Sequence, residues 1–158
     1  MLTGTQSHTE TDLRSDRALA YALFRFTFGL NLMMRGVVRI ALGSNGFVAY
    51  MLKQFEAVPI MPQSFLVLFA TVLPYVETLI GLMILVGFQT RTALVAGSLM
   101  IAALTFGTML RQDFTTAWLQ LDYAIAFFLL LALRSWNAIS VDGMMSDSHP
   151  SSTASREA

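Results

Sequence analysis

Four long apolar segments limit what this chain of 158 residues can fold into. They cover residues 18–42, 64–88, 92–110 and 117–133, and each approaches or exceeds the length of about 20 residues with which an α-helix crosses the hydrocarbon core of a bilayer. Only 13% of all residues are charged, whereas soluble domains carry about 25%. A chain with so little charge cannot cover a water-exposed surface, so we expect an all-α integral membrane protein, a bundle of four spanning helices.

Polar segments surround the four predicted spans. Residues 1–17 and 143–158 are rich in Ser, Thr and charged residues, so we expect two disordered tails around one membrane domain over residues 18–142. Between the first two spans, apolar residues recur at helical spacing over residues 47–56, which predicts a short amphipathic helix in the membrane interface. Four spans place both termini on one side, and the larger number of arginines on that side predicts that it is the cytoplasmic side.

The composition excludes several classes of function. The chain has no cysteine, which removes disulfides, thiol catalysis and Fe–S clusters. Its two histidines, His8 and His149, lie in the polar tails, so we expect no metal site in the membrane domain. A net charge of zero, without basic runs, argues against a nucleic-acid partner. We expect no covalently bound cofactor, and the chain supplies no redox-active group with which to act as an enzyme by itself.

Ionisable residues inside the predicted spans are the candidate functional residues. A charged side chain costs about 2.5–3.5 kcal/mol at the centre of a spanning helix, so such residues usually face the protein interior and find partners. Depths counted at about 1.5 Å per residue place Arg25 and Glu77 at similar levels, which predicts that they form a buried pair or hold a quinone head group. The other members form a predicted cluster in the outer leaflet, namely Asn31, Arg35, Arg39 and Asp122.

Two interpretations of these charges remain open. In the structural interpretation, the charges form pairs that fix the register of the helices. In the functional interpretation, they form a binding site for an anionic or quinone head group, or a proton path. The sequence contains no Walker loop, nucleophile elbow or metal-ligand spacing that would decide between them.

Several short motifs, in order, resemble those of the DoxX family of small four-helix bacterial membrane proteins. The resemblance covers about three quarters of the chain, and it rests on Arg25 with Gly29, on Arg35-Gly36 with Arg39, on the stretch from Glu77 to Arg91, and on Ser140-Val141-Asp142. The chain departs from the family where a His-Gly pair followed by Lys often ends the first helix. It has Arg35-Gly36 and Arg39 there, and Trp136-Asn137-Ala138 replaces the usual glycines before the last motif.

The resemblance implies a protein of the bacterial cytoplasmic (inner) membrane, because family members are linked with quinone-coupled sulfur oxidation or with membrane redox complexes. The lack of Cys, of His within the membrane domain and of any metal constellation favours a small non-catalytic or cofactor-assisting subunit of a larger redox assembly. We expect this subunit to have a structural role or to form a pocket near Arg25 and Glu77 for quinone, lipid or pigment, which it would hold together with other membrane subunits. A catalytic subunit of the thiosulfate:quinone type is the alternative, with Arg35, Arg39 and Asp122 receiving an anionic substrate. A small transporter is a third possibility, because Pro74 lies beside Glu77.

Overall fold

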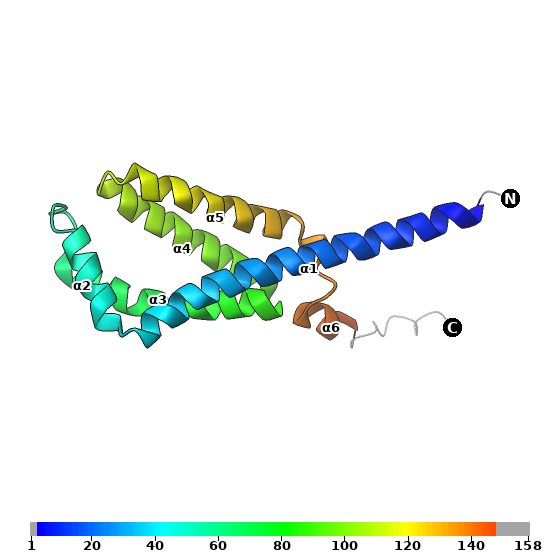
Figure 1. Ribbon diagram of the computed structural model, residues 1–158, viewed down its shortest axis with the longest axis horizontal. Helices are drawn as coiled ribbons and strands as arrows, with labels where there is room; N and C mark the ends of the chain where they lie inside the picture. The colour runs from blue at the N-terminus through cyan, green and yellow to red at the C-terminus, as the bar shows by residue number, and fades with distance from the viewer. Residues whose placement is uncertain (1–2, 148–158) are drawn as a thin grey trace, which may run out of the picture.

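The structure, a computed structural model, describes residues 3–147, and these residues are mostly helical (Figure 1). The elements are α1 (Thr3–Ala41), α2 (Ser44–Gln54), α3 (Gln63–Val86), α4 (Thr90–Leu110), α5 (Phe114–Ala132), the 3₁₀ helix η1 (Arg134–Trp136) and α6 (Val141–Asp147). No strand occurs among the described residues, so the all-α prediction is confirmed for this part of the chain.

Three of these helices are long and apolar enough to cross a membrane: α3, α4 and α5. They overlap the predicted spans 64–88, 92–110 and 117–133. Within the described residues α1 does not meet the same criterion, because Arg25, Arg35 and Arg39 interrupt its apolar half. The membrane character is therefore supported, whereas the predicted bundle of four spanning helices is not confirmed.

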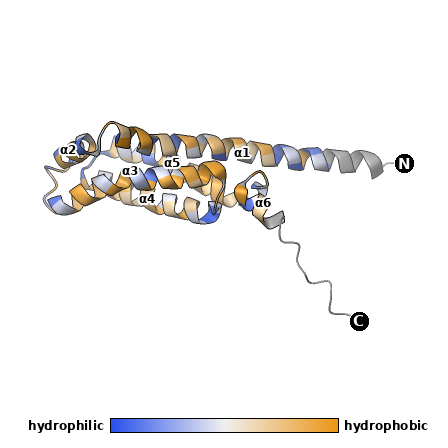
Figure 2. Ribbon diagram, turned by 90° about the horizontal axis from the view of Figure 1, so that it is seen from below, coloured by the Kyte–Doolittle hydropathy of each residue, from blue (hydrophilic) through white to orange (hydrophobic). Residues whose placement is uncertain are grey.

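The long helices associate in pairs. α1 packs mainly along α3 and α4 along α5, while α3 and α4 join the two pairs (Figure 1). Figure 2 shows that apolar residues predominate along the packed helices. Many large apolar side chains are exposed, among them Leu68, Leu99 and Phe128. Exposed apolar side chains of this extent suit a surface that faces lipid.

Glycines bring the backbones of α1 and α3 into contact. A Cβ added at Gly29 would lie 2.6 Å from the backbone nitrogen of Leu85, and one at Gly81 would collide with the backbone of Met33. A Cβ at Gly36 would likewise meet the backbone of α3. Small residues permit this close approach in membrane helix pairs. The three contacts fix the register in which α1 and α3 pass each other.

The ends of the membrane domain differ in part from expectation. Residues 3–17, predicted to be a disordered tail, are the first part of α1 and extend beyond the packed helices (Figure 1). Extending an existing helix avoids the cost of nucleation, which explains how a polar segment continues α1. At the other end, α6 includes the first residues of the predicted tail 143–158, and residues 148–158 of that tail lie outside the described residues.

The predicted amphipathic segment is a helix, α2, as expected. Its Met51 and Phe55 pack against Leu66 and Ala70 at the start of α3. α2 therefore folds back over one end of the α3 helix, and its position in the membrane interface stays a prediction.

Replacing Gly81 by Ala should separate α1 from α3 and destabilise the protein. The added methyl group meets backbone that cannot rotate away, and overpacking of this kind costs about 1–3 kcal/mol. Thermal unfolding in detergent measures the loss. Gly46→Ala in α2 is the matched control, because nothing lies within 4 Å of its added Cβ. Equal melting temperatures for the two variants would show that the close approach does not limit stability.

Candidate functional site

The predicted pair between Arg25 and Glu77 is wrong. The Arg25 guanidinium donates hydrogen bonds to three backbone carbonyls, at 2.8 Å to Ile84, 3.1 Å to Leu85 and 2.9 Å to Ile139. Two of these carbonyls belong to the last turn of α3, which lacks onward helical partners. Arg25 therefore ties the end of α3 to the segment before α6.

The register of α1 and α3 explains the error. Gly29 of α1 lies against Leu85, and Glu77 comes eight positions before Leu85 on the antiparallel α3. Glu77 therefore faces the position eight residues after Gly29 on α1, which lies between Arg35 and Arg39. Depths counted from the ends of the predicted spans do not report the register of two helices. The glycine contacts between α1 and α3 set that register.

Glu77 is the buried acidic residue of the site, with 0% of its surface exposed. Its Oε2 accepts a hydrogen bond from the Arg39 guanidinium, and its Oε1 lies 4.0 Å from Nη2 of Arg35. Oε1 itself has no hydrogen-bond partner within the described residues. A buried carboxylate oxygen without a donor is costly, which marks it as a position where a ligand can donate.

Three of the four residues of the predicted outer cluster come together. The Arg35 guanidinium lies 4.8 Å from the centre of the Tyr123 ring, and the Tyr123 hydroxyl donates to Oδ1 of Asn31 at 3.0 Å. Arg39 lies over the Phe47 ring of α2 at 4.5 Å. Asn31, Arg35 and Arg39 thus form one polar network with aromatic partners, and its acidic member is Glu77.

The fourth member, Asp122, does not join this network. Its side chain is exposed on α5, and it makes no hydrogen bond or ion pair to any residue that the structure describes. The prediction placed it there from depth alone, which does not report the direction in which a side chain leaves the helix.

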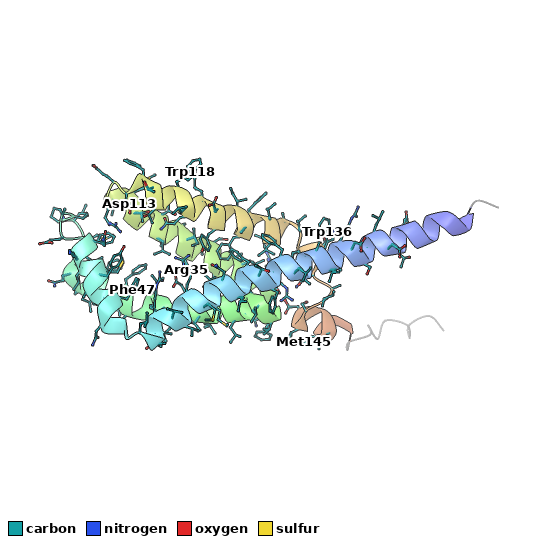
Figure 3. The ribbon with its side chains drawn as sticks, in the orientation of Figure 1. Arg35, Phe47, Asp113, Trp118, Trp136 and Met145 are labelled. Atoms are coloured by element: carbon teal, nitrogen blue, oxygen red, sulfur yellow. The ribbon has the colours of Figure 1, made fainter. Side chains whose placement is uncertain are left out.

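A cavity of about 500 Å³ lies between α1, α2, α3, α4 and α5, with Arg35 and Arg39 of α1 and Glu77 of α3 in its lining. Its wall is mostly apolar and aromatic, and it includes Phe47, Phe55, Phe65, Phe69, Leu66 and Leu73. Figure 3 shows Phe47 and Arg35 near the end of the molecule that α2 covers. An apolar hollow with a few converging polar groups is the usual form of a small-molecule site.

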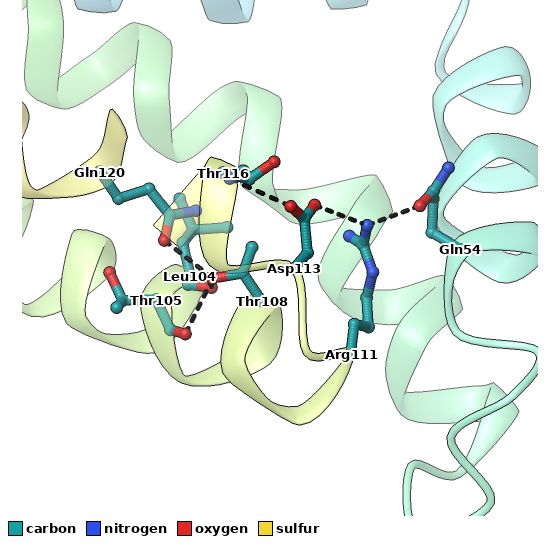
Figure 4. Close-up of polar contacts among 8 residues, drawn as sticks. All are labelled: Gln54, Leu104, Thr105, Thr108, Arg111, Asp113, Thr116 and Gln120. Atoms are coloured by element: carbon teal, nitrogen blue, oxygen red, sulfur yellow. Dashed lines mark hydrogen bonds and ion pairs between the residues drawn. The ribbon is translucent and has the colours of Figure 1, made fainter. Parts of the chain in front are cut away.

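Polar residues at and near the α4–α5 turn also line the cavity, and Figure 4 shows the contacts among them. Arg111 donates to Gln54 of α2 at 2.5 Å and to Asp113 at 3.1 Å, while the Thr108 hydroxyl lies 3.0 Å from Oε1 of Gln120. Asp113 also caps α5 by accepting from the backbone of Thr116, 3.0 Å away. Arg111 lies in the connection between the predicted spans 92–110 and 117–133, and the sequence analysis did not single it out as a site residue.

The short motif near the C-terminus is a helix cap. The Asp142 carboxylate accepts hydrogen bonds from the backbone nitrogens of Gln89 at 2.7 Å and Thr90 at 2.8 Å. Gly87, with φ of 72°, ends α3 at the same place, and a side chain there would collide with Arg25. Arg25, Gly87 and Asp142 together form a structural clamp that joins α3, α4 and α6, at the other end of α3 from the cavity.

Acidification should weaken this clamp. Burial raises the pKa of Asp142, but the hydrogen bonds from Thr90 and Gln89 outweigh that effect and leave the pKa below its ordinary value. A carboxyl group with a lowered pKa in the folded state stabilises the protein above its unfolded pKa of about 3.9, and this contribution is lost as the pH falls through the folded value. Asp142→Ala should remove a cap worth about 0.5–2 kcal/mol at pH 7.

Thermal unfolding of wild type and of Asp142→Ala between pH 7 and pH 3 measures how much the ionised Asp142 carboxylate stabilises the protein. We expect the difference between the melting temperatures of wild type and Asp142→Ala to shrink as the pH falls below about 4. Glu56→Gln, which changes an exposed carboxylate of the α2–α3 connection, is the control. A difference between wild type and Asp142→Ala that stays constant with pH would contradict the role of the ionised carboxylate.

Charge exchange should identify the partner of Glu77. Glu77→Ala leaves Arg39 without its acceptor and should cost about 3 kcal/mol, the low end of the range for breaking a buried pair, because Arg39 retains some exposure. The double variant Glu77→Arg with Arg39→Glu should recover part of this loss, and Glu77→Arg with Arg25→Glu should not. The yield of folded protein and its melting temperature in detergent report the result. Equal recovery by both pairs would contradict the observed pairing.

Comparison with known proteins places this geometry in a family. The chain matches the family described as "TQO small subunit DoxD" over residues 30–150. These residues include the cavity lining, the arginine–glutamate network, and Gly87 and Asp142 of the clamp, whereas Arg25 lies before them. No curated protein and no solved structure matches the chain. A relationship of the DoxD/DoxX type is thereby confirmed, while membership of DoxX itself is not. The protein belongs to the DoxD family.

Proposed function

We propose that the protein is a small membrane subunit of a quinone-linked redox assembly, of the thiosulfate:quinone oxidoreductase kind that its family description names, and that its cavity receives the quinone head group. One observation carries the cavity assignment. Oε1 of Glu77 is buried, lacks a donor within the described residues, and belongs to a residue that lines the cavity next to two arginines.

The lining of the cavity suits a quinone. Arg35 and Arg39 are positioned to donate hydrogen bonds to a carbonyl oxygen of the head group, and Oε1 of Glu77 is positioned to accept one from a hydroxyl group of the reduced form. The aromatic wall is suited to contact the flat ring and the start of an isoprenoid tail. A volume of about 500 Å³ falls within the usual range for small-molecule sites.

Partner subunits supply the rest of the electron path in this proposal. The chain contains no cysteine and has His only at positions 8 and 149, so its own side chains contribute binding, orientation and a site for a proton at Glu77. We propose a location in the bacterial inner membrane with both termini cytoplasmic. That both termini share one side is supported by the start of α1 and α6, which lie at the same end of the packed helices (Figure 1).

The charge of the cavity supports a second candidate, a catalytic subunit that itself binds an anionic substrate. Arg35, Arg39 and Arg111 line the cavity, and Glu77 is the acidic residue of the lining, which leaves an excess of positive charge. Thiosulfate binding to the isolated chain, lost on Arg111→Gln, would favour this candidate. Unchanged affinity for thiosulfate in Arg111→Gln would contradict it.

Changes in the cavity should weaken quinone binding. Glu77→Gln and Arg39→Gln each remove a charged hydrogen-bonding group. We expect each to weaken quinone binding by about 1.4 kcal/mol, which is a tenfold rise in the dissociation constant. Equilibrium binding of a short-chain benzoquinone to the purified protein in detergent measures this change. Arg91→Gln is the matched control, because Arg91 is exposed near the start of α4, away from the cavity.

A filling variant separates binding from folding. Gly107 lines the cavity, and a Cβ there would lie 3.4 Å from the ring of Phe55, an ordinary contact. Gly107→Leu should therefore fold while its larger side chain occupies space that the ligand needs. Quinone affinity equal to that of wild type in both Gly107→Leu and Glu77→Gln would overturn the assignment of the cavity.

A further inference from the structure

A carboxylate faces outward at the middle of a candidate spanning helix. Asp122 lies eight residues after the first residue of α5 and ten before the last, so it is about 12 Å and about 15 Å from the two ends. Trp118 and Ile125, one turn before and one turn after, share its face and are 69% and 56% exposed. Figure 3 shows the Trp118 side chain pointing away from the other helices.

An outward aspartate at this depth is unfavourable in lipid. A charged Asp at the centre of a spanning helix costs about 2.5–3.5 kcal/mol, and its short side chain cannot extend to the interface as Lys and Arg do. Ionisable residues in membranes almost always face protein or a water-filled cavity. The exposure of Asp122 therefore indicates that another protein covers it.

The chain's own arginines near this level are already engaged. Arg25 binds backbone carbonyls, and Arg35 and Arg39 share Glu77. Asp122 has no hydrogen bond or ion pair to the residues that the structure describes. A cation that pairs with it must then come from outside this part of the chain.

α5 is also the least covered of the three candidate spanning helices. Only 17% of its most apolar stretch is buried, compared with 39% for α3. Its main helical neighbour is α4, which leaves the opposite side open (Figure 1). We name the exposed stripe of Trp118, Asp122, Ile125 and Leu129 the α5 face.

We propose that the α5 face docks against a transmembrane helix of a different subunit, and that this helix places a Lys or Arg against Asp122 near the bilayer centre. The inference rests on the proposed function in one respect, that the chain works within a larger assembly. Charge complementarity selects the occupant. Two copies of the chain packed symmetrically through this face would bring two aspartates together, because a two-fold interface joins a surface to itself.

The test uses the full-length tagged chain, isolated from its native membranes in mild detergent and analysed by native mass. Wild type should be recovered in an assembly, and Asp122→Ala should release at least ten times more free chain. Asp122→Asn should act as strongly, because it leaves the partner's cation unpaired. Leu99→Ala, on the 67% exposed outward face of α4, is the control and should remain assembled.

Three results would overturn the inference. If Asp122→Ala leaves the assembly intact, the α5 face has no docking role. If Asp122→Ala dissociates the assembly but Asp122→Asn does not, the partner of Asp122 is not a cation. Wild type recovered free, or as a dimer of the chain alone that Asp122→Ala disrupts, removes the different subunit. Quinone binding by the free chain distinguishes this failure from that of the cavity assignment, because Asp122 does not line the cavity and its variants should bind quinone as wild type does.

Discussion

Contact between the backbones of α1 and α3 underlies the arrangement of every buried charge in this protein. Gly29, Gly36 and Gly81 allow the two helices to touch, and the resulting register sets Glu77 between Arg35 and Arg39. Glycine contacts suit this task in a membrane, where helices associate through close packing rather than by escaping from water. A side chain at any of these positions would separate the helices and carry the carboxylate away from its cations.

The two ends of α3 have different tasks as a consequence. At its C-terminal end the clamp of Arg25, Gly87 and Asp142 binds the last carbonyls of α3 and the first amide groups of α4, the positions at which a helix lacks its own i to i+4 partners. Toward its N-terminal end, α2 and the α4–α5 turn close a cavity over Glu77. The carboxylate on one side of the cavity keeps an oxygen free, whereas the groups of the clamp are used in holding the helices together.

The sequence identified the ionisable residues inside the apolar helices better than it identified which of them lie together. Arg35, Arg39 and Glu77 stood out because ionisable groups inside apolar helices must find partners. The pairing of Arg25 was wrong because residue counting gives depth only approximately, and the observed register places Glu77 opposite a position about three helical turns after Arg25. Arg111 was missed as a member of the cavity because its neighbour Gln54 lies on α2, which is distant in sequence and comes near only when α2 folds back.

By itself the sequence determined the helical class and the location of the three apolar helices, because these follow from local composition and from the length that a bilayer requires. It also determined that the chain has no cysteine and has histidine only at positions 8 and 149. Tertiary structure alone decided the direction of each side chain. It turned Arg25 toward carbonyl groups, Glu77 into a cavity and Asp122 outward. Direction depends on helix register and rotation, which glycine contacts between helices distant in sequence fix, and no local pattern encodes such contacts.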